Sequence, residues 1–172
     1  MKYSDLIKKR YSVRKFSVKP VEQNKVAAIL EAARVAPTAC NNQPQRILVL
    51  QGAENMEKLK ECTLCTFDAP MAMAVCCNMS EAWVRDYDNY NSGIIDASIV
   101  GTHIMLAVHD LGLGSTWVGY FDPAVFRKNF NLPDDIEPVA LFPIGYPASD
   151  AEPAHPYSKR RPLEETVLYD SF

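Results

Sequence analysis

The sequence lacks the features of a membrane-spanning, secreted or nucleic-acid-binding protein. Its longest apolar stretch, residues 94–108, is too short to cross a bilayer and is interrupted by Asp96 and His103. No apolar run of signal-peptide length follows the first residues. The net charge is -3, with 18 Lys and Arg against 21 Asp and Glu, so no general basic excess is available for nucleic acid. We therefore expect a cytoplasmic protein with no membrane and no nucleic-acid partner.

The sequence also lacks the even cysteine count of a complete disulfide framework, because its five cysteines are an odd number. Cys62 and Cys65 have the spacing of a redox or zinc pair. A second zinc pair is usually separated by about two to four residues, whereas Cys76 and Cys77 are adjacent. In a strand these two side chains would point to opposite faces. We expect ordinary thiols at these four positions, and Cys40, in a polar loop, as the cysteine nearest to any chemistry.

No group of residues typical of metal binding or acid–base catalysis stands out. His103 and His109 are six positions apart on a predicted helix, a spacing that does not bring them to one face. His155 lies in the C-terminal tail. No Ser-His-Asp set and no pair of carboxylates is evident either. We therefore expect no metal site and no catalytic triad.

The length and composition indicate one globular domain over residues 1–172, with 48% hydrophobic and 23% charged residues. Hydrophobic periodicity and turn signals predict helices at residues 3–9, 22–35, 54–65, 93–111 and 123–131, and strands at 46–51, 70–77, 115–119 and 138–145. Residues 79–92 are less regular. This pattern favours an α+β fold in which a mixed sheet is flanked by helices.

Two segments suggest contacts beyond a simple domain. The predicted helix 93–111 is apolar almost all round, which is typical of a buried central helix and also suits packing on a partner subunit. Residues 147–172 contain four prolines, so we expect an extended C-terminal arm that crosses a surface. Its apolar end, residues 166–169, favours docking on the domain or on a partner.

Two basic patches lie far apart in the sequence. Residues 9–16 contain Arg10, Ser12 and Arg14, and residues 159–161 are Lys-Arg-Arg. Arginine donates paired hydrogen bonds to phosphate or carboxylate, and a serine hydroxyl adds another donor. The two patches are interpreted as halves of one anion site; a solvated basic helix end followed by a turn is the alternative for the first patch alone.

Four stretches occur in an order that resembles the FMN-dependent nitroreductase family, namely residues 10–16, 36–44, 112–119 and 159–165. The resemblance covers essentially the whole chain. It implies an intertwined homodimer with two FMN sites at the interface, each built from both subunits. It also implies ping-pong transfer of two electrons from NADH or NADPH through FMN to a small-molecule acceptor such as a nitro compound or quinone.

The resemblance also implies roles for individual residues. The residues that would hold the FMN phosphate and ribityl chain are Arg10, Tyr11, Ser12 and Arg14, joined by Lys159, Arg160 and Arg161 of the arm. Those that would lie along the flavin ring are Pro37, Thr38, Ala39, Asn41 and Gln43 from the other subunit, and Trp117, Val118 and Gly119, with the Gly119 amide near N5. Trp83, Tyr87 and Tyr90 would stack on the acceptor, or else pack on the domain. Thr38 and Gln45 stand where serine and tryptophan are frequent in the family.

Other functions remain compatible with the same residues. A non-enzymatic protein that binds or stores flavin would need the same site. Relatives of this fold carry out reductive dehalogenation or flavin fragmentation, and no added lid motif argues for either. An anion-binding module without flavin is the remaining alternative.

Overall fold

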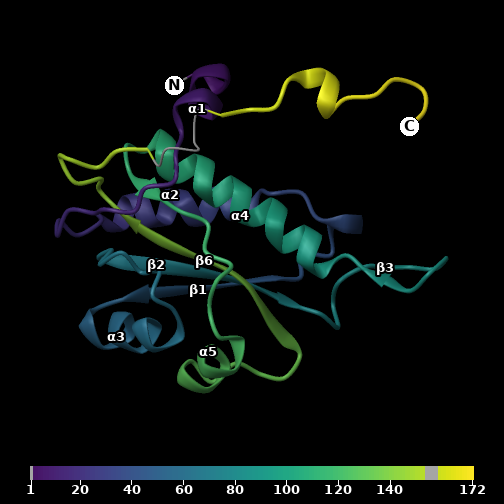
Figure 1. Cartoon of the computed structure of the whole chain (residues 1–172). Coiled ribbons are helices and arrows are strands. Elements are labelled where there is room, and N and C mark those ends of the chain that lie inside the picture. The colour runs from purple at the N-terminus through teal and green to yellow at the C-terminus, as the bar shows by residue number, and fades with distance from the viewer. Residues whose placement is uncertain (1, 154–158) are drawn as a thin grey trace.

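The fold is a four-stranded sheet between two layers of helices in the computed structural model, which describes residues 2–153 and 159–172 (Figure 1). The strands run in the order β1-β2-β6-β5 across the sheet. The sheet strands are β1 (Gln45–Gln51), β2 (Met71–Asn78), β5 (Gly114–Ser115) and β6 (Ile136–Gly145). The helices are α1 (Tyr3–Lys9), α2 (Gln23–Arg34), α3 (Ala53–Cys62), α4 (Gly93–Asp110) and α5 (Pro123–Asn129). This confirms the α+β class.

All neighbouring strands of the sheet pair antiparallel. The sequence predicted a mixed sheet. Among the described residues, parallel pairing is limited to an isolated bridge between Ser12 and Ser115. Every residue of β2 is buried, because this strand lies between β1 and β6 and is covered on both faces. The sheet therefore has one core under α2 and α4 and a second core under α3 and α5, on its opposite face.

The adjacent cysteines of β2 separate into these two cores, as strand alternation predicts. Cys77 packs in the core under α2 and α4, and Cys76 packs in the core under α3 and α5. Burial raises the pKa of the Cys76 thiol to about 12 and that of Cys77 to about 11. Burial also raises the pKa of Cys62 to about 11. These thiols stay protonated at neutral pH and are therefore poor nucleophiles.

Two predicted elements are shorter in the structure, and one observed hairpin was not predicted. The predicted helix 54–65 ends at Cys62, because Thr63 is extended and its hydroxyl donates to the Tyr120 carbonyl oxygen at 2.6 Å. The predicted strand 115–119 shortens to β5, and Val118 instead forms an isolated bridge with Leu141 of β6. Residues 79–92 contain a small hairpin of β3 (Val84–Arg85) and β4 (Tyr90–Asn91) that the sequence pattern did not predict.

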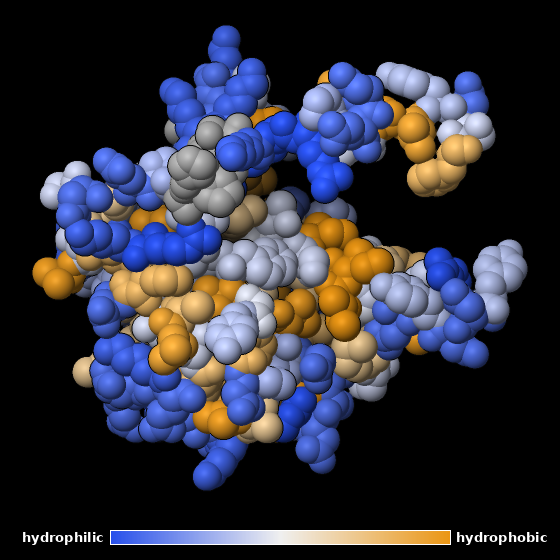
Figure 2. Space-filling view, in the orientation of Figure 1, coloured by the Kyte–Doolittle hydropathy of each residue, from blue (hydrophilic) through white to orange (hydrophobic). Residues whose placement is uncertain are grey.

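The long helix α4 is buried along one face and not all round, which corrects the expectation from its composition. Val100, Ile104 and Val108 are fully buried against the sheet and α2. Ile94 and Ile95 are about half exposed in the single chain, at 53% and 48%. Figure 2 shows apolar surface over this end of α4. The outer side of the first turn of α4 is thus an apolar surface that the single chain does not cover.

The segment after β6 begins on the domain and ends exposed. Phe16 bridges Pro147, and the Ala148 amide donates to the Lys15 carbonyl oxygen at 3.0 Å. Residues 159–172 are exposed and contain one short 3-10 turn, Leu163–Glu165. Figure 1 shows this segment pointing away from the sheet. The predicted docking of the apolar end of this segment is therefore not observed among the described residues of the single chain.

Within the described part of the chain, none of the helices combines the length and apolar character needed to cross a membrane.

Candidate functional site

Two of the four stretches that define the predicted site lie side by side. The Val13 amide donates to the Ser115 carbonyl oxygen at 3.0 Å, next to the Ser12–Ser115 bridge. The strands approach closely because residue 114 is glycine: a Cβ there would lie 2.5 Å from Val13 Cγ2, well inside van der Waals contact. The contact places the N-terminal basic patch beside β5, where the run that continues to Gly119 begins.

The basic patch presents donors of different exposure. Arg14 is exposed, and its Nη1 lies 3.5 Å from the Ser12 carbonyl oxygen. Arg10 and Ser12 are half-buried, and the Nη1 atom of Arg10 is fully buried. The Tyr11 hydroxyl donates to the Ala151 carbonyl oxygen at 3.4 Å. The patch thus combines one guanidinium open to a ligand with a second that is held against the domain.

The positive charge of the patch also acts on the end of α4. The pKa of His109 is lowered, first by burial and then by the nearby charge of Arg10. His109 is therefore neutral at pH 7 and does not add to the positive charge.

The three basic residues of the C-terminal segment are Lys159, Arg160 and Arg161, and all are exposed. The Nη1 atom of Arg160 donates to the Lys159 carbonyl oxygen at 3.1 Å. That one of these three residues contacts the FMN phosphate stays a prediction.

The loop between α2 and β1 has an unusual backbone. After the extended residue Thr38, a short 3-10 turn covers Ala39–Asn41. Cys40, Asn41 and Gln43 have φ values of 51°, 56° and 53°. Non-glycine residues in this left-handed region are uncommon, and each is less stable by about 1–3 kcal/mol. Such a backbone persists only where its surroundings hold it.

One end of this loop is fixed by a buried carboxylate. Asp96 of α4 is 1% exposed, and its Oδ1 accepts a hydrogen bond from the Ala39 amide at 2.8 Å. Its Oδ2 accepts from the Ser92 hydroxyl at 2.8 Å. Within the loop, Thr38 Oγ1 accepts from the Gln43 amide at 3.0 Å. Loop and helix are thereby joined through a single side chain.

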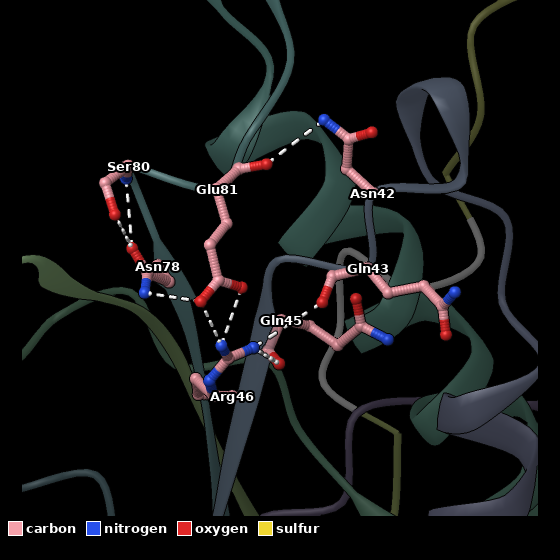
Figure 3. A network of polar contacts seen from close by, with 7 residues as sticks. All are labelled: Asn42, Gln43, Gln45, Arg46, Asn78, Ser80 and Glu81. Atoms are coloured by element: carbon pink, nitrogen blue, oxygen red, sulfur yellow. Dashed lines mark hydrogen bonds and ion pairs between the residues drawn. The ribbon is translucent and has the colours of Figure 1, made fainter.

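The other end of the loop is held by the polar network in Figure 3. Asn42 Nδ2 donates to the Glu81 carbonyl oxygen at 3.1 Å. Arg46 Nη2 lies 2.6 Å from each carboxylate oxygen of Glu81, and Asn78 Nδ2 donates to one of them at 2.9 Å. Arg46 Nη1 also reaches the Gln43 carbonyl oxygen at 3.5 Å. The loop therefore leaves Asn41 and Gln43 exposed on a backbone fixed on both sides.

The run after β5 offers an aromatic ring and an open stretch of backbone. Trp117 packs edge-on against Phe142, with ring centroids 5.0 Å apart, and stays 36% exposed. Val118 is buried and exchanges two backbone hydrogen bonds with Leu141. A Cβ at Gly119 would meet no atom within 4 Å. A flat ligand can therefore approach the Gly119 backbone closely.

The three aromatic residues predicted to contact the acceptor lie on or next to the hairpin. Tyr87 is 97% exposed, and Tyr90 lies under the Arg85 guanidinium at 5.1 Å. Trp83 is 37% exposed. The hairpin points away from the sheet (Figure 1). The alternative prediction, that these residues pack on the body of the domain, is therefore wrong for Tyr87. The prediction that the three residues contact the acceptor stays a prediction.

A cavity of about 510 Å³ lies elsewhere, between the end of α3 and the start of α5. It is lined by Lys60, Glu61, Cys62, Thr63, Leu64, Tyr120, Phe121, Asp122 and Pro123. Its charged side chains already have partners: Lys60 pairs with Glu57 and Asp68, Glu61 accepts from Asn129, and the Asp122 side chain caps α5. The cavity therefore offers no charged side chain comparable to the exposed Arg14.

In residues 2–153 and 159–172, no group of three or more His, Cys, Asp or Glu side chains is arranged to hold a metal ion.

The structure thus has two helical layers around an antiparallel sheet, with an arginine patch against β5. The family model described as "Nitroreductase family" matches residues 7–76 and 65–146. These matches span most of the chain. The chain therefore belongs to the nitroreductase family.

Individual relatives agree with this assignment. A Methanothermobacter thermautotrophicus protein, provisionally named NADH dehydrogenase/NAD(P)H nitroreductase, is 33% identical over 153 residues, covering 85% of this chain and 78% of its own length. The structure of a nitroreductase family protein from Clostridium difficile has a TM-score of 0.94 at 40% identity and covers 100% of both chains. A Desulfovibrio desulfuricans protein, provisionally named a nitroreductase and solved in complex with FMN, has a TM-score of 0.83 at 27% identity and covers 100% of this chain and 98% of its own.

The sequence pattern predicted roles for the basic patch and for the run after β5, and the structure places the patch against β5, where that run begins. It did not identify Asp96, Glu81 or Arg46 as supports of the loop. An acidic residue within an otherwise apolar helical stretch was the available signal for Asp96. Arg46 and Glu81 are 35 positions apart, so their pairing depends on the fold.

We predict that Gly114→Ala lowers the free energy of unfolding by about 1–3 kcal/mol, because the new methyl group overlaps Val13. Urea unfolding monitored by circular dichroism measures this. Gly119→Ala is the matched control, since its methyl group enters open space and stability should stay within about 0.5 kcal/mol of the original protein. Equal stability of the two variants would contradict the close approach of residues 13 and 114.

Proposed function

We propose that this protein is a cytoplasmic FMN-dependent oxidoreductase that passes two electrons from NADH or NADPH to a nitro compound, quinone or similar acceptor. Donor and acceptor use the same site in turn, by a ping-pong mechanism. The observation that carries the proposal is the contact of the patch of Arg10, Ser12 and Arg14 with Ser115, where the run that ends at Gly119 begins. The relatives named as NAD(P)H nitroreductases, and the 27% identical structure solved with FMN, support it.

The residues of the basic patch fit the phosphate of FMN. A phosphate dianion needs several charge-assisted donors, and arginine supplies them in paired geometry. Arg14 is exposed and Ser12 lies between the two arginines in the sequence. Arg14 would bind the phosphate, Arg10 would add positive charge from behind, and Ser12 would donate its hydroxyl.

The run from Trp117 to Gly119 fits the ring of FMN. FMN itself supplies the hydride chemistry, and the protein contributes position and electrostatics. A backbone N–H near the ring would stabilise negative charge that develops on it. The open space at Gly119 allows that approach, and the partly exposed Trp117 precedes it by two residues.

The loop of residues 38–43 would complete the ring site from a second copy of the chain. Its amide and hydroxyl groups are polar, and Asn41 is exposed on a backbone that is held at both ends. A fixed loop loses little conformational entropy on contact with a ligand. Asn41 would therefore orient the ring, with Gln43 beside it.

A homodimer accounts for the apolar surfaces that the single chain leaves uncovered. Ile94 and Ile95 of α4 and Ile7 of α1 are exposed, as are Leu168 and Tyr169 of the C-terminal segment. Exposed apolar surface of this kind is typical of protein interfaces. The arm of one copy would dock on the other and bring Lys159, Arg160 or Arg161 to a phosphate site.

The exposed aromatic residues of the hairpin suit an acceptor pocket. Tyr87 and Trp83 are accessible to a planar substrate in the single chain. Stacking on an aromatic ring is favourable by about 0.5–1.5 kcal/mol beyond the burial of area. We place the acceptor between this hairpin and the flavin ring.

The experiment that tests the function is a visible absorption spectrum of the purified protein, recorded before and after anaerobic NADPH and then NADH. The proposal predicts a flavin spectrum that bleaches with at least one donor and returns when a nitro compound or quinone is added. Bound flavin that neither donor bleaches would indicate a flavin-binding or storage protein. A protein that takes up no FMN would contradict the flavin site itself.

We predict that Arg14→Ala weakens FMN binding by about 1.5–3 kcal/mol, the contribution typical of a hydrogen bond to a charged group. Fluorescence titration of apoprotein with FMN measures the dissociation constant. Arg34→Ala is the control, because Arg34 is an exposed arginine of α2 that pairs with Glu31. If Arg14→Ala retains FMN as well as Arg34→Ala does, Arg14 is not a phosphate ligand.

We predict that truncation after Ala148 lowers both the stability of the dimer and its flavin content. Analytical ultracentrifugation and the ratio of flavin to protein absorbance measure the two effects. Replacing residues 159–161 by alanine separates the two roles of the arm, because it should reduce flavin content while leaving the dimer intact. A truncated chain that sediments as a flavin-loaded dimer would show that the arm has neither role.

A further inference from the structure

We infer that Asp96 is a positioning residue for the flavin site: its buried carboxylate fixes the backbone of the 38–43 loop through the Ala39 amide. This inference rests on the proposed function, because it assigns to the loop a place beside the flavin ring. It names the side chain on which the geometry of that loop depends.

A buried carboxylate needs an explanation in this helix. Asp96 is 1% exposed on the face of α4 that also carries Ala97 and Val100, both fully buried. Removing a charge from water is unfavourable by several kcal/mol unless hydrogen bonds replace the lost hydration. The hydrogen bonds from the Ala39 amide and the Ser92 hydroxyl, each 2.8 Å, partly replace it. Of these, only the bond to Ala39 leaves the helix.

The bond to Ala39 is placed where the loop backbone is most constrained. Ala39 directly precedes Cys40 and Asn41, which are both left-handed. Residues in that conformation relax readily once a neighbouring contact is lost, because the extended and right-handed regions are more stable. The Asp96 bond therefore holds the residues that would lie along the flavin ring.

A simpler role for Asp96 would be to offset the dipole at the start of α4. An acidic residue in the first turn of a helix is stabilising for that reason. The position of the Asp96 carboxylate in the first turn is sufficient for that role. The dipole requires no contact with Ala39, however, so the two roles predict different responses when that contact alone is removed.

The bond also links the loop to the proposed dimer interface. Ile94 and Ile95, which immediately precede Asp96, are exposed on the outer face of the same helix turn. A shift of this turn would move Asp96 and the loop together. The loop geometry is thus tied to the helix that we propose to pack on a second copy.

The test compares Asp96→Ala with Asp96→Asn. The asparagine oxygen can still accept from the Ala39 amide, and its amide group can donate to the Ser92 hydroxyl, so geometry is kept while charge is lost. We expect Asp96→Ala to weaken FMN binding about tenfold or more, as loss of a hydrogen bond to a charged group predicts, and Asp96→Asn to stay within about threefold. Glu57→Gln on α3, which removes an exposed carboxylate that pairs with Lys60, is the control for charge.

Two further readouts separate positioning from general stability. Visible circular dichroism of the flavin at saturating FMN should change in Asp96→Ala and not in Asp96→Asn, because it reports the surroundings of the ring. Hydrogen exchange of the apoprotein should be faster at residues 39–43 in Asp96→Ala and unchanged in Asp96→Asn.

The variant Ala39→Pro removes the hydrogen-bond donor on the loop side of the same contact. The extended Thr38 tolerates a following proline, so this variant should weaken FMN binding in the same way as Asp96→Ala.

The outcomes distinguish this inference from the proposed function. Wild-type affinity and wild-type flavin dichroism in both Asp96→Ala and Ala39→Pro would overturn the positioning role, even if exchange at residues 39–43 became faster. If Asp96→Ala does not fold, Ala39→Pro decides the same question. An original protein that binds no FMN would instead contradict the proposed function, and the flavin part of this inference with it.

Discussion

The hydrogen bond between the Val13 amide and the Ser115 carbonyl oxygen is the contact on which the candidate site depends. It forms because Gly114 has no side chain to keep the two segments apart. Through it, a basic patch near the N-terminus meets the run after β5, which lies about a hundred residues further along the chain. The next residues, through the bridge between Phe16 and Pro147, bring the start of the C-terminal segment to the same region.

The elements of the proposed site are each exposed in the single chain. Arg14, Gly119 and Asn41 are exposed, and the outer side of the first turn of α4 is apolar and uncovered. By contrast, the cavity between α3 and α5 is lined by charged side chains that already have partners. An open polar site beside an uncovered apolar helix is the arrangement expected where a second copy completes the site, and this is why the dimer is part of the proposed function.

Much of the fold could be predicted from the sequence because local patterns determine it. The helical repeat of α2 and the continuous apolar run of β2 each indicate one structure, and strand alternation alone separated Cys76 from Cys77. Composition was less informative for α4: it gave the length of the helix, but the exposure of Ile94 depends on which neighbours surround it. The hairpin was missed because its strands have two residues each, too few for any periodicity.

The site could be predicted only in part, for related reasons. The arginine patch is a local sequence feature, so it could be predicted as a candidate site from the sequence. The supports of the 38–43 loop could not be predicted, because Asp96 and Glu81 act across the fold and the left-handed backbone of Cys40 has no marker such as glycine.

A crystal structure of the protein grown with FMN is the most direct test of the central claim. We predict a dimer with phosphate between Arg10, Ser12 and Arg14, the ring beside the Gly119 amide, and the 38–43 loop of the second copy against it. A phosphate bound away from Arg14, or a ring that touches neither Gly119 nor that loop, would contradict it.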